Sequence, residues 1–246
     1  LLTPKILTSD LLGIGVKQPF FINLNRSSDL TFSILKTTNT NFLLETDYRK
    51  VFFNGRLFFS GAAKPASADN FIDGYFQIRG ETTLFKNSIL EYDATAVSDS
   101  GFLGKYGYSD TDRLTSIIAL TNQKERSFSK LSTTYFTSLR DNEEEEYIIV
   151  PDFYTRYFNH NKTLDVFSGT EISLLGLTKR NLETDIRLHA SFDTEKTWRT
   201  HHGLQLKGTT KLASSLYREN LGEKEDILYK YIDPTLGLEL SIPLYR

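Results

Sequence analysis

The chain has 246 residues, with 29 lysines and arginines against 31 aspartates and glutamates, which gives a net charge of −2. This near balance gives no electrostatic argument for nucleic-acid binding. The chain contains no cysteine, so disulfides and thiolate metal sites within it are excluded. No apolar run approaches the ~18 residues of a membrane helix.

Segments with the period-two alternation of β-strands follow one another along the whole chain. After two strand-like runs near the start, the predicted strands cover residues 30–35, 41–49, 55–63, 71–82, 89–98, 114–120, 127–139, 147–158, 164–174, 182–194, 204–216 and 236–244. The Asn54-Gly55 pair predicts a tight hairpin turn, and 99–111 and 159–162 are expected to be connectors. No stretch has a helical period and no linker divides the chain, so one continuous all-β domain is expected.

The segment 182–194 has the clearest alternation in the chain. Its apolar face carries Leu182, Ile186, Leu188 and Phe192, whereas the opposite face is charged. A strand of this length is about twice the usual ~5–6 residues of soluble sheets. It suits the ~9–11 residues that a tilted strand needs to cross a bilayer.

Alternation alone does not say which face is wet, because a soluble sandwich buries its apolar face and an outer-membrane barrel turns it to lipid. Strand length and the mixture of acids, bases and amides on the polar faces favour the barrel. Aromatic residues near strand ends also favour it, as an interfacial girdle of Tyr154, Tyr157, Phe158, Trp198 and Tyr245. We therefore expect an antiparallel up-and-down transmembrane β-barrel, of which this chain supplies about a dozen strands. A soluble β-sandwich binding module is the alternative.

Four short motifs, in this order, resemble the LptD family of lipopolysaccharide-assembly outer-membrane proteins, also called organic solvent tolerance proteins. They are the Pro-aromatic-aromatic segment 18–24 with 28–31, the Ser-Asp loop 97–103 with Tyr106-Gly107, the segment 150–153, and the segment 233–239 with 242–244. The resemblance implies that residues 1–246 are a fragment of the barrel domain, with the periplasmic domain and later strands outside it. It also implies the outer membrane of a Gram-negative bacterium as the location.

The implied function is non-enzymatic: lipopolysaccharide is accepted from a periplasmic bridge and inserted into the outer leaflet through a lateral opening of the barrel. The implied partners are lipopolysaccharide, an LptE-like lipoprotein inside the barrel, an LptA-like bridge and outer-membrane lipid. By this resemblance, Pro4 and Pro19 match the family's gate prolines, and the alternative for each is that it only begins a strand. Proline cannot donate a ladder hydrogen bond, which would weaken a seam between strands.

The polar face of the predicted strands 182–194 and 204–216 is expected to line the lumen and contact sugar hydroxyls and phosphates. Its candidate residues are Glu183, Asp185, Arg187, His189, Asp193, Lys207 and Lys211. Simple hydration of a lumen wall is the alternative for each of them. No catalytic or metal motif is found, so no catalytic residue, cofactor or metal is expected. A porin or adhesin-type channel remains the other membrane interpretation.

Overall fold

The computed structural model describes residues 2–39, 42–65, 72–140, 147–179, 184–201, 203–219 and 227–242. These residues form strands, with one helical turn. The elements in chain order are β1 (Lys5–Ser9), β2 (Gly13–Asn25), β3 (Ser28–Thr37), β4 (Leu43–Phe52), β5 (Gly55–Pro65), β6 (Ile72–Phe85), β7 (Ser88–Val97), α1 (Phe102–Lys105), β8 (Arg113–Lys124), β9 (Ser127–Ser138), β10 (Tyr147–Asn161), β11 (Val166–Lys179), β12 (Thr184–Arg199), β13 (Gln205–Glu219) and β14 (Ile227–Ser241).

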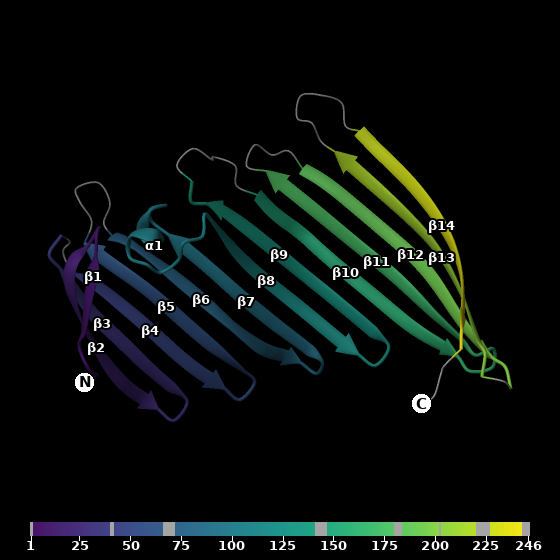
Figure 1. Ribbon diagram of the computed structural model, residues 1–246, viewed down its shortest axis with the longest axis horizontal. Helices are drawn as coiled ribbons and strands as arrows, with labels where there is room; N and C mark the ends of the chain where they lie inside the picture. Colours follow the sequence, from purple (N-terminus) through teal and green to yellow (C-terminus); the bar gives the residue numbers. More distant parts are fainter. Residues whose placement is uncertain are drawn as a thin grey trace. The chain divides into compact units, whose positions relative to one another are not determined.

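The strands pair in chain order, from β1 to β14, in one antiparallel sheet (Figure 1). The prediction of an all-β, up-and-down connectivity is therefore confirmed. The expected barrel is not closed, because among the described residues β1 and β14 each have a single neighbour. Closure requires the first and last strands to pair. The sheet also has fourteen strands rather than about a dozen.

The chain divides into two compact units. The first comprises Leu1–Ala119 and Thr134–Tyr147, and it contains β1 to β7 and α1. The second comprises Leu120–Thr133 and Ile148–Arg246, and it contains most of β10 and all of β11 to β14. The division passes through β8 and β9, and each unit is described by itself below.

In the first unit, the two ends of the strands differ in the length of their connections. At one end, two residues join β2 to β3, β4 to β5 and β6 to β7. The predicted hairpin is confirmed, but its two turn residues are Phe53 and Asn54, because Gly55 already begins β5 and pairs with Phe52. At the other end, the connections are 10–12, 38–42, 66–71 and 98–112. The last of these contains α1, which is a single turn and too short to produce a helical period in the sequence.

In the second unit, β12 confirms the predicted long strand from Thr184 onward and continues to Arg199. Its neighbours β11 and β13 pair with it without a register shift. The predicted turn at 159–162 lies later than expected, because β10 continues through Asn161. The side-chain oxygen Oδ1 of Asn161 accepts hydrogen bonds from the backbone N–H groups of Thr163 and Leu164, at 3.0 and 3.1 Å, which fixes the turn after the strand.

No helix in the described residues is long and apolar enough to cross a membrane.

Candidate functional site: the polar face of the sheet

Strand register divides the first unit into two faces, because directly paired residues point to the same side of a sheet. We call the side that carries Glu45 the polar face and the side that carries Leu44 the apolar face. Charged and amide residues on the polar face include Lys5, Lys17, Asn23, Asp29, Glu45, Asp47, Arg49, Arg56, Lys64, Asp73, Gln77, Arg79, Glu81, Glu91 and Asp93. Large apolar residues on the opposite face include Ile14, Val16, Phe20, Ile22, Phe32, Ile34, Leu44, Leu57, Phe59, Phe76 and Ile78.

Side chains on the polar face of the first unit pair across adjacent strands. The pairs and their distances are Arg49 Nε to Asp29 Oδ1 at 2.8 Å, Arg56 Nε to Glu81 Oε1 at 3.0 Å, Lys64 Nζ to Asp73 Oδ2 at 3.1 Å, and Gln77 Nε2 to Asp93 Oδ1 at 2.9 Å. Ion pairs that remain partly exposed contribute little stability individually. Their main consequence is a continuous polar surface.

The polar face is hollowed at a cavity of about 310 Å³ between β3 and β6. Its polar and aromatic lining comes from Thr31, Asp47, Tyr48, Arg49, Phe58, Phe59, Ser60, Gln77 and Arg79. The Arg79 guanidinium carbon lies 5.5 Å from the centre of the Phe58 ring. Guanidinium groups, hydroxyls and an amide beside an aromatic plane can bind sugar hydroxyls or a phosphate.

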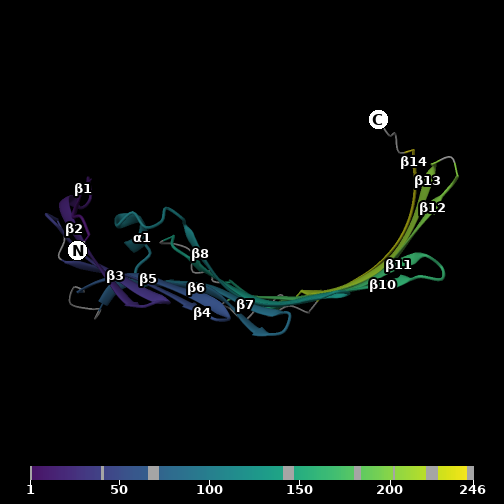
Figure 2. The ribbon, with the colours of Figure 1, turned by 90° about the horizontal axis from the view of Figure 1, so that it is seen from below.

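The connection 98–112 lies over one end of this polar face, and Figure 2 shows α1 on one side of the neighbouring strands. Phe102 and Leu103 of α1 are buried against Leu35, Leu43 and Ala62 of the sheet. These three sheet residues occupy polar-face positions. The buried cluster therefore explains why the polar face carries apolar residues at this end of the strands.

A hydrogen bond anchors the same connection to the sheet. The Tyr108 hydroxyl donates to Glu45 Oε1 at 2.6 Å, and Lys17 forms an ion pair with the same buried carboxylate. Burial, together with the neighbouring Glu45 carboxylate, raises the pKa of Tyr108. This contact was not predicted from the sequence. The sequence does carry one indication of it: Leu35 is apolar at a position where the alternation of its strand predicts a polar residue.

Asp112 and Arg140 join the connection before β8 to the connection after β9. Arg140 Nε donates to Asp112 Oδ2 at 2.9 Å, and the backbone N–H of Leu139 donates to the Asp112 carbonyl at 2.9 Å. The hydrogen bond and positive charge of Arg140 lower the pKa of Asp112. This carboxylate therefore remains ionised, and the bridge remains formed, through the neutral pH range.

The first predicted gate residue, Pro19, is buried in β2 opposite Ser33 of β3. Its carbonyl accepts a hydrogen bond from the backbone N–H of Leu2 at 3.3 Å. The N–H and C=O groups of one strand residue point to the same side, so the donor that proline lacks would face the β1 side. The β1–β2 ladder extends only from Ser9 opposite Gly13 to Lys5 opposite Lys17, and so ends before Pro19.

The second predicted gate residue, Pro4, is exposed and lies immediately before β1 rather than inside it. This corrects its expected place in a strand. Because proline has no backbone N–H, it is found at strand starts and edges rather than in paired interior positions. Both prolines nonetheless lie at the β1 edge of the first unit.

In the second unit, the predicted lumen residues share one face. Asp193 pairs with Lys211, and Thr197 pairs with Lys207, which places the two lysines of β13 on the same side as Asp185, Arg187, His189 and Asp193 of β12. The predicted shared face is thus confirmed for these six residues. Glu183 lies outside the described residues.

The apolar residues of β12 are exposed on the other side. Ile186, Leu188 and Phe192 have exposed fractions of 39%, 38% and 50%. Their pairing partners on β13 include Leu216 and Leu212, which are also exposed. These side chains are not buried in a protein core within the described residues, so this face of the sheet has no second layer there.

Charged residues on the polar face of the second unit form a network over three strands. Arg156 of β10 contacts Glu171 of β11 at 3.4 Å and Asp193 of β12 at 3.2 Å. The Tyr154 hydroxyl donates to Glu171 Oε2 at 3.2 Å. The sequence analysis did not identify Arg156 or Glu171, although the period-two spacing of Tyr154 and Arg156 was a usable signal.

The remaining predicted residues have separate contacts. His189 Nδ1 lies 2.9 Å from Ser215 Oγ, and the Arg187 guanidinium carbon lies 5.4 Å from the Tyr217 ring centre. Lys207 Nζ lies 2.9 Å from Glu195 Oε2. These contacts distribute positive and negative charge along the face rather than concentrating it in one site.

The proposed aromatic girdle is partly wrong. Tyr154 and Phe158 lie on the polar face, where Tyr154 bonds to Glu171 and the Phe158 ring lies 4.9 Å from the Arg156 guanidinium carbon. Tyr157 and Trp198 lie on the opposite face and are exposed. Tyr245 lies outside the described residues.

Within the described part of the chain, no three His, Asp or Glu side chains are arranged to hold a metal ion. No protein-family model matches the chain, and no curated protein matches it. The clearest functional feature of this chain is therefore its division into a charged face and an exposed apolar face.

Proposed function

We propose that the chain is part of an LptD-like outer-membrane β-barrel that inserts lipopolysaccharide into the outer leaflet through a lateral opening. The observation that carries this proposal is the division between faces in each unit. Charged and hydrogen-bonded side chains occupy one face, while large apolar side chains are exposed on the other. This arrangement suits a wall between lipid and a water-filled lumen. A soluble β-sandwich would cover its apolar face with a second sheet.

Strand length and connection length support the membrane placement. Strands β2 to β14 have 10 to 16 residues, which meets the ~9–11 residues required to cross a bilayer. The first unit has two-residue turns at one end and longer connections at the other. Bacterial outer-membrane barrels have the same asymmetry, with short turns in the periplasm and longer loops outside the cell.

An open sheet edge in hydrocarbon would leave backbone groups without hydrogen bonds. In this proposal, further strands of the full-length protein close the barrel beside β1 and β14. Lipopolysaccharide is amphiphilic, so its lipid portion must leave sideways while its sugars remain in water. A seam at β1, weakened at Pro4 and Pro19, would make that step easier.

The polar face of the second unit would then contact the saccharide and phosphate groups of lipopolysaccharide. Arg187, Lys207 and Lys211 supply positive charge for phosphates, while Asp185, His189, Asp193 and Glu183 supply hydrogen-bonding groups for sugars. By resemblance to the LptD family, the protein partners would be an LptE-like lipoprotein inside the barrel and an LptA-like periplasmic bridge.

Photocrosslinking during transport tests this function in the full-length protein. Photoreactive amino acids at Arg187 and Pro19 are expected to form adducts that carry the lipopolysaccharide saccharide. Leu188 is the matched control because it is adjacent to Arg187 in β12 and faces the opposite side. A porin or other channel predicts no saccharide adduct at either test position. Absence of adducts at both positions would overturn the transport function.

A further inference from the structure

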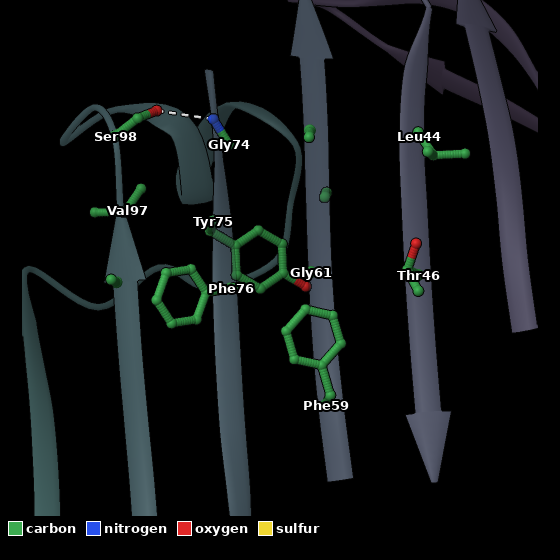
Figure 3. Close-up of a pocket in the computed structure, with 12 residues that line it drawn as sticks. Leu44, Thr46, Phe59, Gly61, Gly74, Tyr75, Phe76, Val97 and Ser98 are labelled. Carbon is green, nitrogen blue, oxygen red and sulfur yellow. Dashed lines mark hydrogen bonds between the residues drawn. The ribbon is translucent and has the colours of Figure 1, made fainter. Parts of the chain in front are cut away.

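A groove of about 490 Å³ crosses the apolar face of the first unit between β4 and β7 (Figure 3). Its lining residues are Leu44, Thr46, Phe59, Gly61, Ala62, Ala63, Gly74, Tyr75, Phe76, Ala96, Val97 and Ser98. The volume lies within the ~300–1,000 Å³ of small-molecule sites. By register, Leu44, Thr46, Phe59, Gly61, Ala63, Gly74, Phe76 and Ala96 lie on the apolar face, opposite α1, whereas Ala62, Tyr75 and Val97 occupy polar-face positions at its floor.

Small residues form the floor of the groove. Ala63 pairs with Gly74, and Gly61 pairs with Phe76, whose other neighbour is Ala96. A side chain cannot be accommodated at Gly74, because an added Cβ would lie 2.3 Å from the Ala62 carbonyl oxygen. Because these positions carry small residues, the centre of the groove is left unfilled and larger side chains lie only at its sides.

Larger side chains form the walls. Leu44 and Phe76 are 48% and 49% exposed, and Phe59 lies on the same face of β5. Figure 3 shows the Phe59 ring beside Gly61 and the Phe76 ring between β6 and β7, with Leu44 and Thr46 on the neighbouring strand β4. These walls are only one side chain high, which is too shallow and narrow for a helix.

The chemistry of the lining also restricts the occupant. None of the described residues that line the groove carries a charged side chain. The floor strands are paired with neighbours on both sides, so a peptide strand cannot be added to them. At one end, the Ser98 hydroxyl already accepts a hydrogen bond from Gly74 N at 2.8 Å. A flexible hydrocarbon chain fits a site that is apolar and requires no hydrogen bonds.

We propose that this groove binds one acyl chain of an outer-leaflet lipid. The proposal rests on the membrane placement proposed above, and it adds a lipid site remote from the β1 seam. We assign the site to the outer leaflet because Ser98, at one end of the groove, begins the 15-residue connection 98–112 after β7. Long connections lie on the extracellular side of bacterial barrels.

A lipid with a photoactivatable group in its acyl chain tests this site in the full-length protein, reconstituted in bilayer nanodiscs. Adducts mapped by mass spectrometry are expected to be at least threefold more frequent at Ala63 than at Ile34. These positions share a face and lie in register two strands apart, because Ala63 pairs with Leu44 and Leu44 pairs with Ile34. Ile34 does not line the groove.

Two variants of β7 separate groove binding from general contact with lipid. Ala96→Leu places a larger side chain on the groove floor and is expected to reduce labelling of Ala63 to the level of Ile34. Ala94→Leu makes the same change on the same face but outside the groove. It is expected to leave the enrichment unchanged, which controls for effects on folding and insertion.

The outcomes distinguish the groove from the membrane placement. Equal labelling of Ala63 and Ile34, unaffected by either variant, would overturn the groove proposal alone. Labelling of the polar-face residue Ser60 as strongly as Ala63 would overturn the membrane placement itself. Crosslinks to a protein partner or a second copy of the chain, in place of lipid adducts, would also overturn the acyl-chain proposal.

Discussion

The buried carboxylate of Glu45 connects the sheet to the connection 98–112. It receives a hydrogen bond from Tyr108 and an ion pair from Lys17. A buried acceptor that loses a partner retains its desolvation cost without the compensating bond. The Tyr108 hydroxyl should therefore contribute to stability out of proportion to its size.

At the residue scale, we expect Tyr108→Phe to lower the free energy of unfolding by about 1–3 kcal/mol, the range for leaving a buried polar group unsatisfied. The urea midpoint measures this change. Tyr48→Phe is the matched control, because Tyr48 is on β4 with Glu45 and its hydroxyl forms no hydrogen bond with the described residues. Equal midpoints for the two variants would contradict the role assigned to the Tyr108 bond.

At the element scale, the β1–β2 ladder is the shortest of those that join β1 to β7, with five paired positions against eight to eleven in the others. The ladder ends at Lys5 opposite Lys17. Beyond that point, Gln18 Nε2 donates to the carbonyls of Leu2 and Pro19 at 3.0 and 2.9 Å. A side chain thus substitutes for part of the missing backbone pairing.

Pro19→Ala restores a backbone donor on the β1 side of β2, and we expect it to slow lipopolysaccharide release by about two- to tenfold. This range follows from the net ~0.5–1.5 kcal/mol of one hydrogen bond. Release from the full-length protein into bilayers measures the effect. Pro65→Ala, at the end of β5 and away from β1, should leave the rate unchanged. An unchanged release rate in Pro19→Ala would contradict a role for Pro19 in the lateral opening.

At the scale of the whole molecule, the proposed function requires every strand to turn its apolar residues toward lipid. The chain has no cysteine, so a single introduced cysteine is a unique chemical probe. Arg187 and Phe192 are suitable positions because they are exposed residues on opposite faces of β12.

We expect Arg187→Cys in the membrane-inserted full-length protein to react with a water-soluble maleimide. Phe192→Cys should react at least tenfold more slowly until detergent removes the bilayer, because lipid would cover that face. Labelling followed by mass spectrometry measures both rates. Fast reaction at Phe192→Cys in intact membranes, or a folded monodisperse protein in buffer without detergent, would contradict the barrel orientation.

The alternation of residues along the chain was enough to predict the strands and the two faces of each strand, because a period of two is a local property of neighbouring residues. Residues 182–194 therefore predicted most of β12, and Asp185, Arg187 and His189 were correctly placed on one face. The final strand was predicted too short: it begins at Ile227, where alternation is weak.

The tertiary structure decided everything that depends on register and on contacts distant in sequence. It brought Arg156 to Asp193, 37 residues away, and Tyr108 to Glu45, 63 residues away. It also placed an apolar cluster under α1 and, within the described part of the chain, left β1 and β14 each paired on one side only. Alternation specifies which way a side chain points, but only strand pairing specifies which side chains it meets.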